Sequence, residues 1–442
     1  MANIVLEYLE SECGLDFSKC RGQSYDNAAN MSGKYRGMQQ IMLEHNKHAV
    51  FIPCSAHSLN LVGRSAVDCC TKAVDFFSTV QELYNFFVAS THRWKVLTQH
   101  LAENCVLKTL SDTRWEAHAA ATHAISDSYS RIIDALNALS HDQSQKGDTK
   151  REAKNHTKKM KQLEFALMLV VWDEILQAFH RTSQRLQAKT ANLSVCANLY
   201  VSLETFLTQL RNEFDRLETA AKERVPDTEY KESNARKCIR KKQHNDGQAP
   251  ELELNPRDKF RVQTFYVIID TLQAEIQRRG SVYKKLGDKF DFLADTKIAQ
   301  DRCDQKASDL ISCYPDDLDT NLSSELRQFH AYLLSRNESC VDVSYGHSYL
   351  YSIMIEDGIQ DVFPNVDIAL RIFLTLMITN CTAERSFSQL KKIKCPARNA
   401  MTQNRLEALS LLCVESDMLR QIQFTDLIDQ FATQKSRKKL IK

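Results

Sequence analysis

The sequence predicts an α-dominated α/β fold. Only 11 Gly and 7 Pro occur among 442 residues, too few for a sandwich, a propeller or a collagen-like chain. Apolar residues recur every three or four positions along most of the chain, the spacing of an amphipathic helix. Strand-like stretches are short and lie near the N-terminus. A chain of this length, 43% hydrophobic, can bury a large core and hold more than one domain.

Charge and cysteine content exclude several classes of protein. Lys and Arg total 58 against 56 Asp and Glu, so any affinity for nucleic acid must come from local clusters rather than a net charge of +2. The 14 Cys are scattered without a C-x-x-C pair, which indicates a reduced, intracellular protein. Residues 1–12 do not resemble a secretory signal, and the longest clear apolar run, 165–172, is far shorter than the roughly 18 residues of a membrane span. We expect a soluble protein without a membrane partner.

The first segment alternates between helix and strand. Residues 3–11 have apolar side chains at helical spacing, and 20–25 form a short stretch closed by turn-prone residues. A second helical pattern covers 31–46, and 48–53 are typical of a strand before a helix from about Ser58. The predicted order is helix, strand, helix, strand, helix, which is part of an α/β unit.

The long middle segment is predicted to be a helical bundle with polar interruptions. We expect residues 140–161 and 216–259 to be exposed loops or mobile linkers, because charged and turn-forming residues dominate them. Two apolar stripes fall on single helical faces. They comprise Leu199, Leu203, Phe206, Leu210, Phe214 and Leu217, and Phe265, Ile268, Ile269, Leu272 and Ile276.

The last segment returns to strongly amphipathic helices. Their apolar surface exceeds what two isolated helices can bury against each other, which predicts self-association into a homodimer, unless the rest of the same chain covers it. The basic tail, with Lys435, Arg437, Lys438, Lys439 and Lys442, is interpreted as solvated in preference to a nuclear-import or phosphate-binding role. The stripes comprise Ala369, Leu370, Phe373, Leu376 and Met377, and Leu406, Leu409, Leu412 and Cys413.

Four short motifs occur along the chain, and together in this order they are far more specific than any one of them alone. They are Gly22-Gln-Ser-Tyr-Asp26-Asn27-Ala-Ala-Asn30-Met-Ser-Gly33, Cys54-Ser-Ala-His57-Ser-Leu59-Asn60-Leu61, Asp112-Thr-Arg114-Trp115 and Thr382-Ala-Glu384-Arg385-Ser-Phe387-Ser388. With them the chain resembles the hAT superfamily of DNA transposases over nearly its whole length. It looks closest to the transposase-derived part of MYM-type zinc-finger and TTF-type-domain proteins.

The resemblance implies an RNase H-like domain interrupted by a large helical insertion. Its N-terminal part would span residues 1–115, the insertion 116–362, and the C-terminal helices with the hAT dimerisation region 363–442. Family members hold divalent metal with two Asp and one Glu, of which Asp26 matches the second and Glu384 the third. From the residues alone, an Asx turn at Asp26 and a first-turn helical Glu384 are the simpler interpretations.

One departure from the family pattern bears on catalysis. The family's first Asp lies on a strand upstream of the helix that begins here near Asn3, so we expect that acid and three strands to be missing. Two-metal catalysis needs all its ligands, so we expect no cofactor in this chain. Binding of Mg²⁺ or Mn²⁺ is expected only if the missing N-terminal part exists. This predicts a catalytically incomplete protein that acts in the nucleus through dimerisation and association with DNA or chromatin. The alternatives are an active hAT transposase whose N-terminal part is missing from the gene model, and a decaying fragment.

The remaining motif residues admit two interpretations each. Cys54 and His57 have zinc-like spacing, but no second pair follows, so a buried structural role is favoured over metal binding. Arg114 and Trp115 match a family motif in which Arg contacts phosphate and Trp stacks on a base, with core packing as the equal alternative for Trp115. A solvated charge run is the commoner explanation for the densest basic cluster, which could also meet phosphate. That cluster comprises Arg236, Lys237, Arg240, Lys241 and Lys242.

Overall fold

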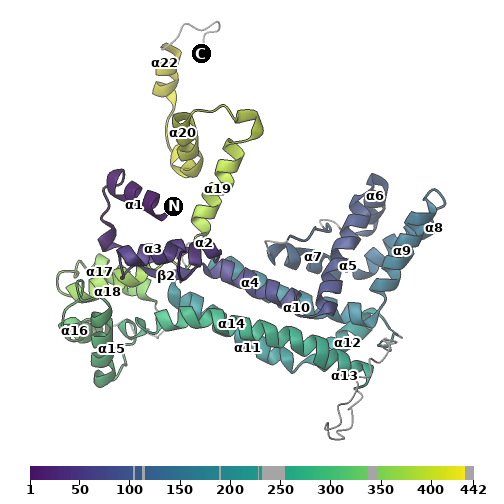
Figure 1. Cartoon of the computed structure of the whole chain (residues 1–442), viewed down its shortest axis with the longest axis horizontal. Coiled ribbons are helices and arrows are strands. Elements are labelled where there is room, and N and C mark those ends of the chain that lie inside the picture. The colour runs from purple at the N-terminus through teal and green to yellow at the C-terminus, as the bar shows by residue number, and fades with distance from the viewer. Residues whose placement is uncertain are drawn as a thin grey trace. The chain divides into compact units, whose positions relative to one another are not determined.

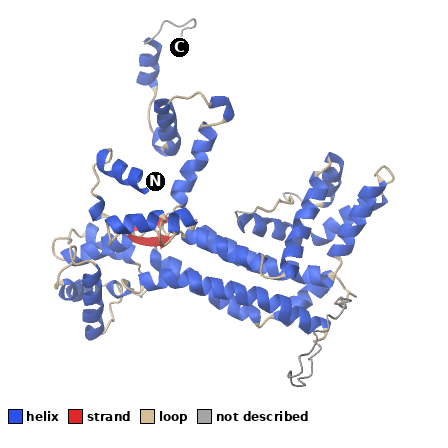
Figure 2. Ribbon diagram, in the orientation of Figure 1, coloured by secondary structure: helices blue, strands red, loops and turns tan. Residues whose placement is uncertain are grey.

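The computed structural model shows a chain built mostly of helices, and its described part contains two short strands (Figures 1 and 2). It divides into two units, Met1–Thr379 and Asn380–Lys442, which are described separately. The prediction of an α-dominated chain is confirmed. The structure describes residues 1–102, 105–111, 115–188, 191–226, 228–230, 254–336 and 346–433, without the side chains of residues 382, 384 and 397.

The first unit opens with the predicted alternation of helices and strands. The strands β1 (Gly22–Tyr25) and β2 (Val50–Pro53) are parallel, with Gly22 opposite Val50 and Tyr25 opposite Pro53. Helix α4 begins at Ser55 rather than near Ser58, because Ser55 and Ser58 are buried and hydrogen-bonded, which apolar spacing does not reveal. The other elements here are α1 (Ala2–Ser11), η1 (Phe17–Lys19), α2 (Ala29–Ser32), α3 (Met38–His45) and α4 (Ser55–Val67).

A group of helices follows in which one prediction was wrong. Residues 140–161 were expected to be a loop, yet most of them form the helix α9. Ala153, His156 and Met160 are buried at helical spacing, and α9 packs on α8. The many lysines of α9 hide this sparse apolar pattern in the sequence. The helices are α5 (Thr71–Val88), α6 (Thr91–His100), α7 (Trp115–Asp127), α8 (Tyr129–His141) and α9 (Gly147–Met160).

Long helices form the centre of the first unit. Figure 1 shows α11 and α14 side by side, and α14 also packs on α4. The predicted stripe from Leu199 to Leu217 is divided between α11 and α12. Because α12 continues to Arg224, the prediction of a loop from residue 216 was wrong for residues 216–224. The buried Leu217 and Ala221 explain this helix. The elements are α10 (Leu163–Leu186), α11 (Leu193–Arg211), α12 (Phe214–Arg224), α13 (Pro256–Phe260), η2 (Arg261–Phe265) and α14 (Tyr266–Gly287).

The first unit ends with shorter helices around α18. The predicted stripe on α18 is buried as far as Leu376, whereas Met377 is 57% exposed, because the helix ends at Thr375. No helix in the described part of the chain is long and apolar enough to cross a membrane. These elements are η3 (Asp291–Leu293), α15 (Gln300–Cys313), α16 (Leu322–Ser335), α17 (His347–Glu356) and α18 (Pro364–Thr375).

The second unit contains four further described helices and one short 3₁₀ turn. Helices α19 and α20 pack against each other, and the Cys413 thiol donates to Oε1 of Gln389 across this contact. The elements are α19 (Cys381–Ile393), η4 (Pro396–Arg398), α20 (Gln403–Val414), α21 (Ser416–Leu419) and α22 (Thr425–Thr433).

One glycine in α4 allows a tryptophan to reach the core. The ring of Trp115 lies directly on Gly63, where an added Cβ would be 2.0 Å from the ring atom Cε2. The ring also stacks on His118 at 4.9 Å between centroids and meets the edge of Phe77 at 6.4 Å. Close packing of α7 on α4 therefore depends on the missing side chain of Gly63.

We expect Gly63→Ala to lower the free energy of unfolding by at least about 2 kcal/mol, because overpacking a rigid ring forces the helices apart. Urea denaturation followed by circular dichroism measures this change. Gly287→Ala is the matched control, since an added Cβ there meets nothing within 4 Å, and stability should stay the same or rise by up to about 1 kcal/mol. Equal stability of the two variants would contradict the packing described.

Candidate functional site

The first two sequence motifs meet at the carboxyl ends of β1 and β2. Because the strands are parallel and in register, both end at the same edge of the pair. The side-chain amide of Asn27 donates to Oγ of Ser58 over 2.9 Å, across 31 positions of sequence. The backbone N–H of Cys54 donates to the carbonyl oxygen of Tyr25 at 3.0 Å. These bonds join the end of β1 to the start of α4.

Two buried tyrosines from the central helices complete this junction. The hydroxyl of Tyr283, on α14, lies 2.9 Å from the carbonyl oxygen of Pro53 and 3.0 Å from Oγ of Ser58. The hydroxyl of Tyr200, on α11, donates to the carbonyl oxygen of Ser55 at 2.9 Å. Burial raises the pKa of both phenols far above the ordinary value, so both stay protonated and able to donate.

The segment that precedes the last motif reaches the same edge. The carbonyl oxygen of Ile378 accepts the backbone N–H of Ser55 at 2.8 Å, and the buried thiol of Cys54 lies 3.8 Å from Oγ1 of Thr379. Gly22 on β1 packs against Leu376, whose Cδ2 would be 3.2 Å from an added Cβ. Residues from widely separated parts of the first unit therefore converge here.

Asp26 lies at this edge, half-buried, immediately after β1. Its Oδ1 accepts the backbone N–H of Ala28 at 3.1 Å, which is the Asx turn that the sequence offered as the simpler interpretation. The backbone of Glu384 belongs to α19 in the second unit, and its side chain lies outside the described part of the structure. A catalytic or metal-binding role for the two acids stays a prediction.

The structure assigns the thiol of Cys54 to packing at the junction. His57, three residues later on α4, is half-buried. Within the described ranges, no group of three or more His, Cys, Asp or Glu side chains is placed to hold a metal ion. The zinc-like spacing of the pair is thus not extended into a larger ligand group there.

Of the residues predicted to bind DNA, only Trp115 is described. Its side chain is 9% exposed, packed between Gly63 and neighbouring rings, which supports the core-packing interpretation over base stacking. Arg114 lies outside the described residues. The basic cluster of Arg236, Lys237, Arg240, Lys241 and Lys242 also lies outside them.

Tyr200 and Tyr283, which fix the junction, were not among the residues predicted from the sequence. For Tyr200 the available signal was its place within the apolar stripe from Leu199 to Leu217, because a buried tyrosine hydroxyl needs a hydrogen-bond partner. Tyr283 lies beyond the end of the second stripe, so this signal did not extend to it. Gly280 was a second signal: an added Cβ there would be 3.1 Å from the ring of Tyr200, so α11 and α14 approach closely at this point. Neither signal identifies Ser55 or Pro53 as the partner.

The second unit exposes many large apolar side chains. Leu406 and Leu409 are half-buried, whereas Leu412 is 46% exposed and the neighbouring Leu411 is 64% exposed. Exposed apolar side chains in such number on a small unit are typical of a surface that contacts another protein chain. The exposed large apolar residues from α19 onward are Phe387, Leu411, Leu412, Val414, Met418, Ile422, Phe424, Leu427, Ile428 and Phe431.

Residues 358–418 match the hAT family C-terminal dimerisation region. The matched range begins before α18 and extends through α19 and α20 into α21. It includes Leu406, Leu409 and Leu412. The match supports membership of the hAT superfamily, and it supports self-association of this chain.

We expect Tyr283→Phe to lower the free energy of unfolding by about 1 to 3 kcal/mol, because the half-buried carbonyl of Pro53 and the buried Oγ of Ser58 lose a partner. Thermal and urea unfolding measure the loss. Tyr35→Phe is the control, since Tyr35 is fully at the surface and its hydroxyl remains replaceable by water. A Tyr283→Phe protein as stable as this control would contradict the structural role of the junction.

Proposed function

We propose that this chain is a transposase-derived protein that acts through dimerisation, associates with DNA or chromatin in the nucleus, and does not itself cut DNA. The observation that carries the proposal is the match of residues 358–418 to the hAT dimerisation region, which overlaps the apolar surface of the second unit. The order of the four motifs supports the wider kinship. The residues of these motifs favour kinship with the transposase-derived part of MYM-type zinc-finger and TTF-type-domain proteins.

An apolar surface on α20 and α21 is the proposed dimer contact. Leu411, Leu412, Val414 and Met418 are each exposed by more than two fifths of their surface. Burying one leucine side chain is worth about 1.5 to 3 kcal/mol before the costs of association, so several together can hold two copies. In this proposal Leu412 reaches the partner copy, and Leu406 and Leu409 support it from the half-buried side of α20.

Sedimentation at micromolar protein tests this surface. We expect the unmodified chain to be a dimer and Leu411→Asp with Leu412→Asp to be a folded monomer, because two buried carboxylates at the contact are costly. Leu334→Asp is the matched control: Leu334 is 62% exposed on α16 of the first unit, so the dimer should persist. A monomeric unmodified chain, or a double variant that dimerises unchanged, would refute the proposal.

We propose an RNase H-like relationship for the N-terminal part of the first unit. It is supported by the parallel pairing of β1 with β2, by the helices α2 and α3 that connect them, and by the position of Asp26 after β1. In open α/β sheets, ligands bind beyond the carboxyl ends of the strands. The first two motifs meet at that edge, where a catalytic acid of this fold would lie.

The proposal that the chain does not cut DNA rests on its acids. The resemblance supplies Asp26 and Glu384 where three ligands are needed, and one oxygen of Asp26 already accepts a backbone hydrogen bond. Asp26 and Glu384 are matched to the family's acids by the resemblance alone, since the side chain of Glu384 lies outside the described residues. The proposal includes no metal cofactor and no catalytic step.

Incubation of the purified chain with Mg²⁺ or Mn²⁺ and terminal-repeat DNA tests this part of the proposal. We expect neither strand cleavage nor strand transfer, and the same result for Asp26→Ala. The products are separated on a denaturing gel. Cleavage by the unmodified chain that disappears in Asp26→Ala would favour the alternative, an active hAT transposase.

A further inference from the structure

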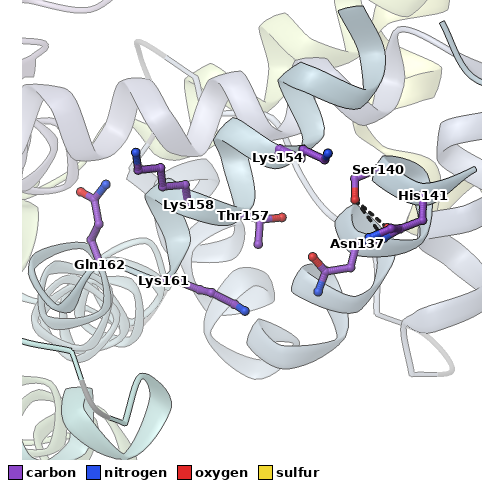
Figure 3. A pocket seen from close by; sticks show the side chains of 8 residues that line it. All are labelled: Asn137, Ser140, His141, Lys154, Thr157, Lys158, Lys161 and Gln162. Carbon is purple, nitrogen blue, oxygen red and sulfur yellow. Dashed lines mark hydrogen bonds between the residues drawn. The ribbon is translucent and has the colours of Figure 1, made fainter. Parts of the chain in front are cut away.

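Three lysines surround an open hollow in the first unit, away from the junction. The hollow has a volume of about 500 Å³ and lies between α8, α9 and the start of α10. Lys154, Lys158 and Lys161 line it, opposite the polar side chains of Asn137 and Ser140 (Figure 3). Figure 3 shows the lysine side chains extending separately around the hollow rather than toward one shared partner.

Helical geometry gathers these lysines on one side of α9. At about 100° per residue, Lys154, Lys158 and Lys161 fall within about 60° of one another around the axis. Ala153, His156 and Met160 occupy a buried face centred about 130° around the axis from the lysines. The acids Asp148 and Glu152 lie at a similar angle in the other direction and do not line the hollow.

Among the described residues, no carboxylate forms an ion pair with the lysines of the hollow. Other charged residues in this region form ion pairs: Arg151 with Asp148, Lys159 with Glu82, and Glu152 with Arg93. By contrast, Lys154, Lys158 and Lys161 are exposed and make no ion pair with any residue the structure describes. No carboxylate lines the hollow, so its potential is positive in spite of the near-neutral chain.

We infer that this hollow binds the phosphate backbone of a nucleic acid. The inference rests on the proposed association with DNA and gives it a surface separate from the Arg236 to Lys242 cluster. The charges extend about 10 Å along the axis of α9, which suits a chain of phosphates better than one anion. No aromatic ring of Phe, Tyr or Trp lines the hollow, so it offers contacts to phosphate without base stacking, and binding is independent of sequence.

Fluorescence anisotropy with short labelled duplexes of two unrelated sequences tests the inference. We expect equal affinity for both, falling steeply between about 50 and about 200 mM salt as counterions compete. In Lys154→Gln, Lys158→Gln, Lys161→Gln the slope of log affinity against log salt should become shallower by about 2 to 3, since each phosphate contact contributes about 0.9. The matching Lys→Arg triple should keep the slope.

The control triple is Lys284→Gln, Lys285→Gln, Lys297→Gln, which removes the same charge from exposed lysines elsewhere in the first unit. Its slope should stay unchanged. An unchanged slope in the hollow triple, with DNA still bound by the unmodified chain, refutes the hollow alone. Absence of DNA binding by the unmodified chain refutes the hollow and the proposed DNA association together, while dimerisation is measured independently.

Two further ligands separate the sources of negative charge. Polyglutamate should bind the unmodified chain more weakly than DNA, and inorganic phosphate should displace the duplex only as weakly as an equal concentration of other salt. Equal affinity for polyglutamate would overturn the assignment to phosphodiesters. Displacement by low concentrations of inorganic phosphate would assign the hollow to a free anion and overturn the assignment to a backbone.

Discussion

The hydrogen bonds of Ser58 with Asn27 and Tyr283 are the constraint on which the first unit depends. They lie where β1 and β2 end, and a buried polar group without a partner costs about 1 to 3 kcal/mol. A parallel pair of four-residue strands has little backbone bonding of its own. Helices α11 and α14 supply further hydrogen bonds, because Tyr200 bonds to the carbonyl oxygen of Ser55 and Tyr283 to that of Pro53.

The contacts at this junction give several motif residues a structural role. Asn27, Cys54 and Ser58 belong to segments that resemble a transposase, and in the structure they hold the strands, α4 and the end of the first unit together. Asp26 stands beside them on a well-fixed scaffold. The packing and hydrogen bonds of this scaffold do not depend on metal-binding acids. Fold and activity are separable in this way for any site built on a fold.

The two proposed surfaces differ in chemistry and lie in different units. The second unit offers leucine, methionine and phenylalanine side chains suited to another protein chain, and the hollow at α9 offers unpaired ammonium groups suited to phosphate. A dimer would carry two such hollows. When two weak sites are linked, the second binding step becomes intramolecular, so a long duplex is held more tightly than either hollow alone could hold it. The weak local charge of a near-neutral chain is then enough to hold a long duplex.

Local spacing determined the helical class, the order of the first five elements and the buried stripe on α18, because apolar periodicity needs no knowledge of distant residues. It failed at α9, where only Ala153, His156 and Met160 mark the buried face among many lysines. The motifs indicated Asp26, Cys54 and His57, but not the distant residues that contact the junction where Asp26 and Cys54 lie. Only the tertiary structure decided that Tyr283 meets Ser58 across 225 positions, and that Trp115 is buried on Gly63. Both depend on which helices pack together, and neither side chain carries that information by itself.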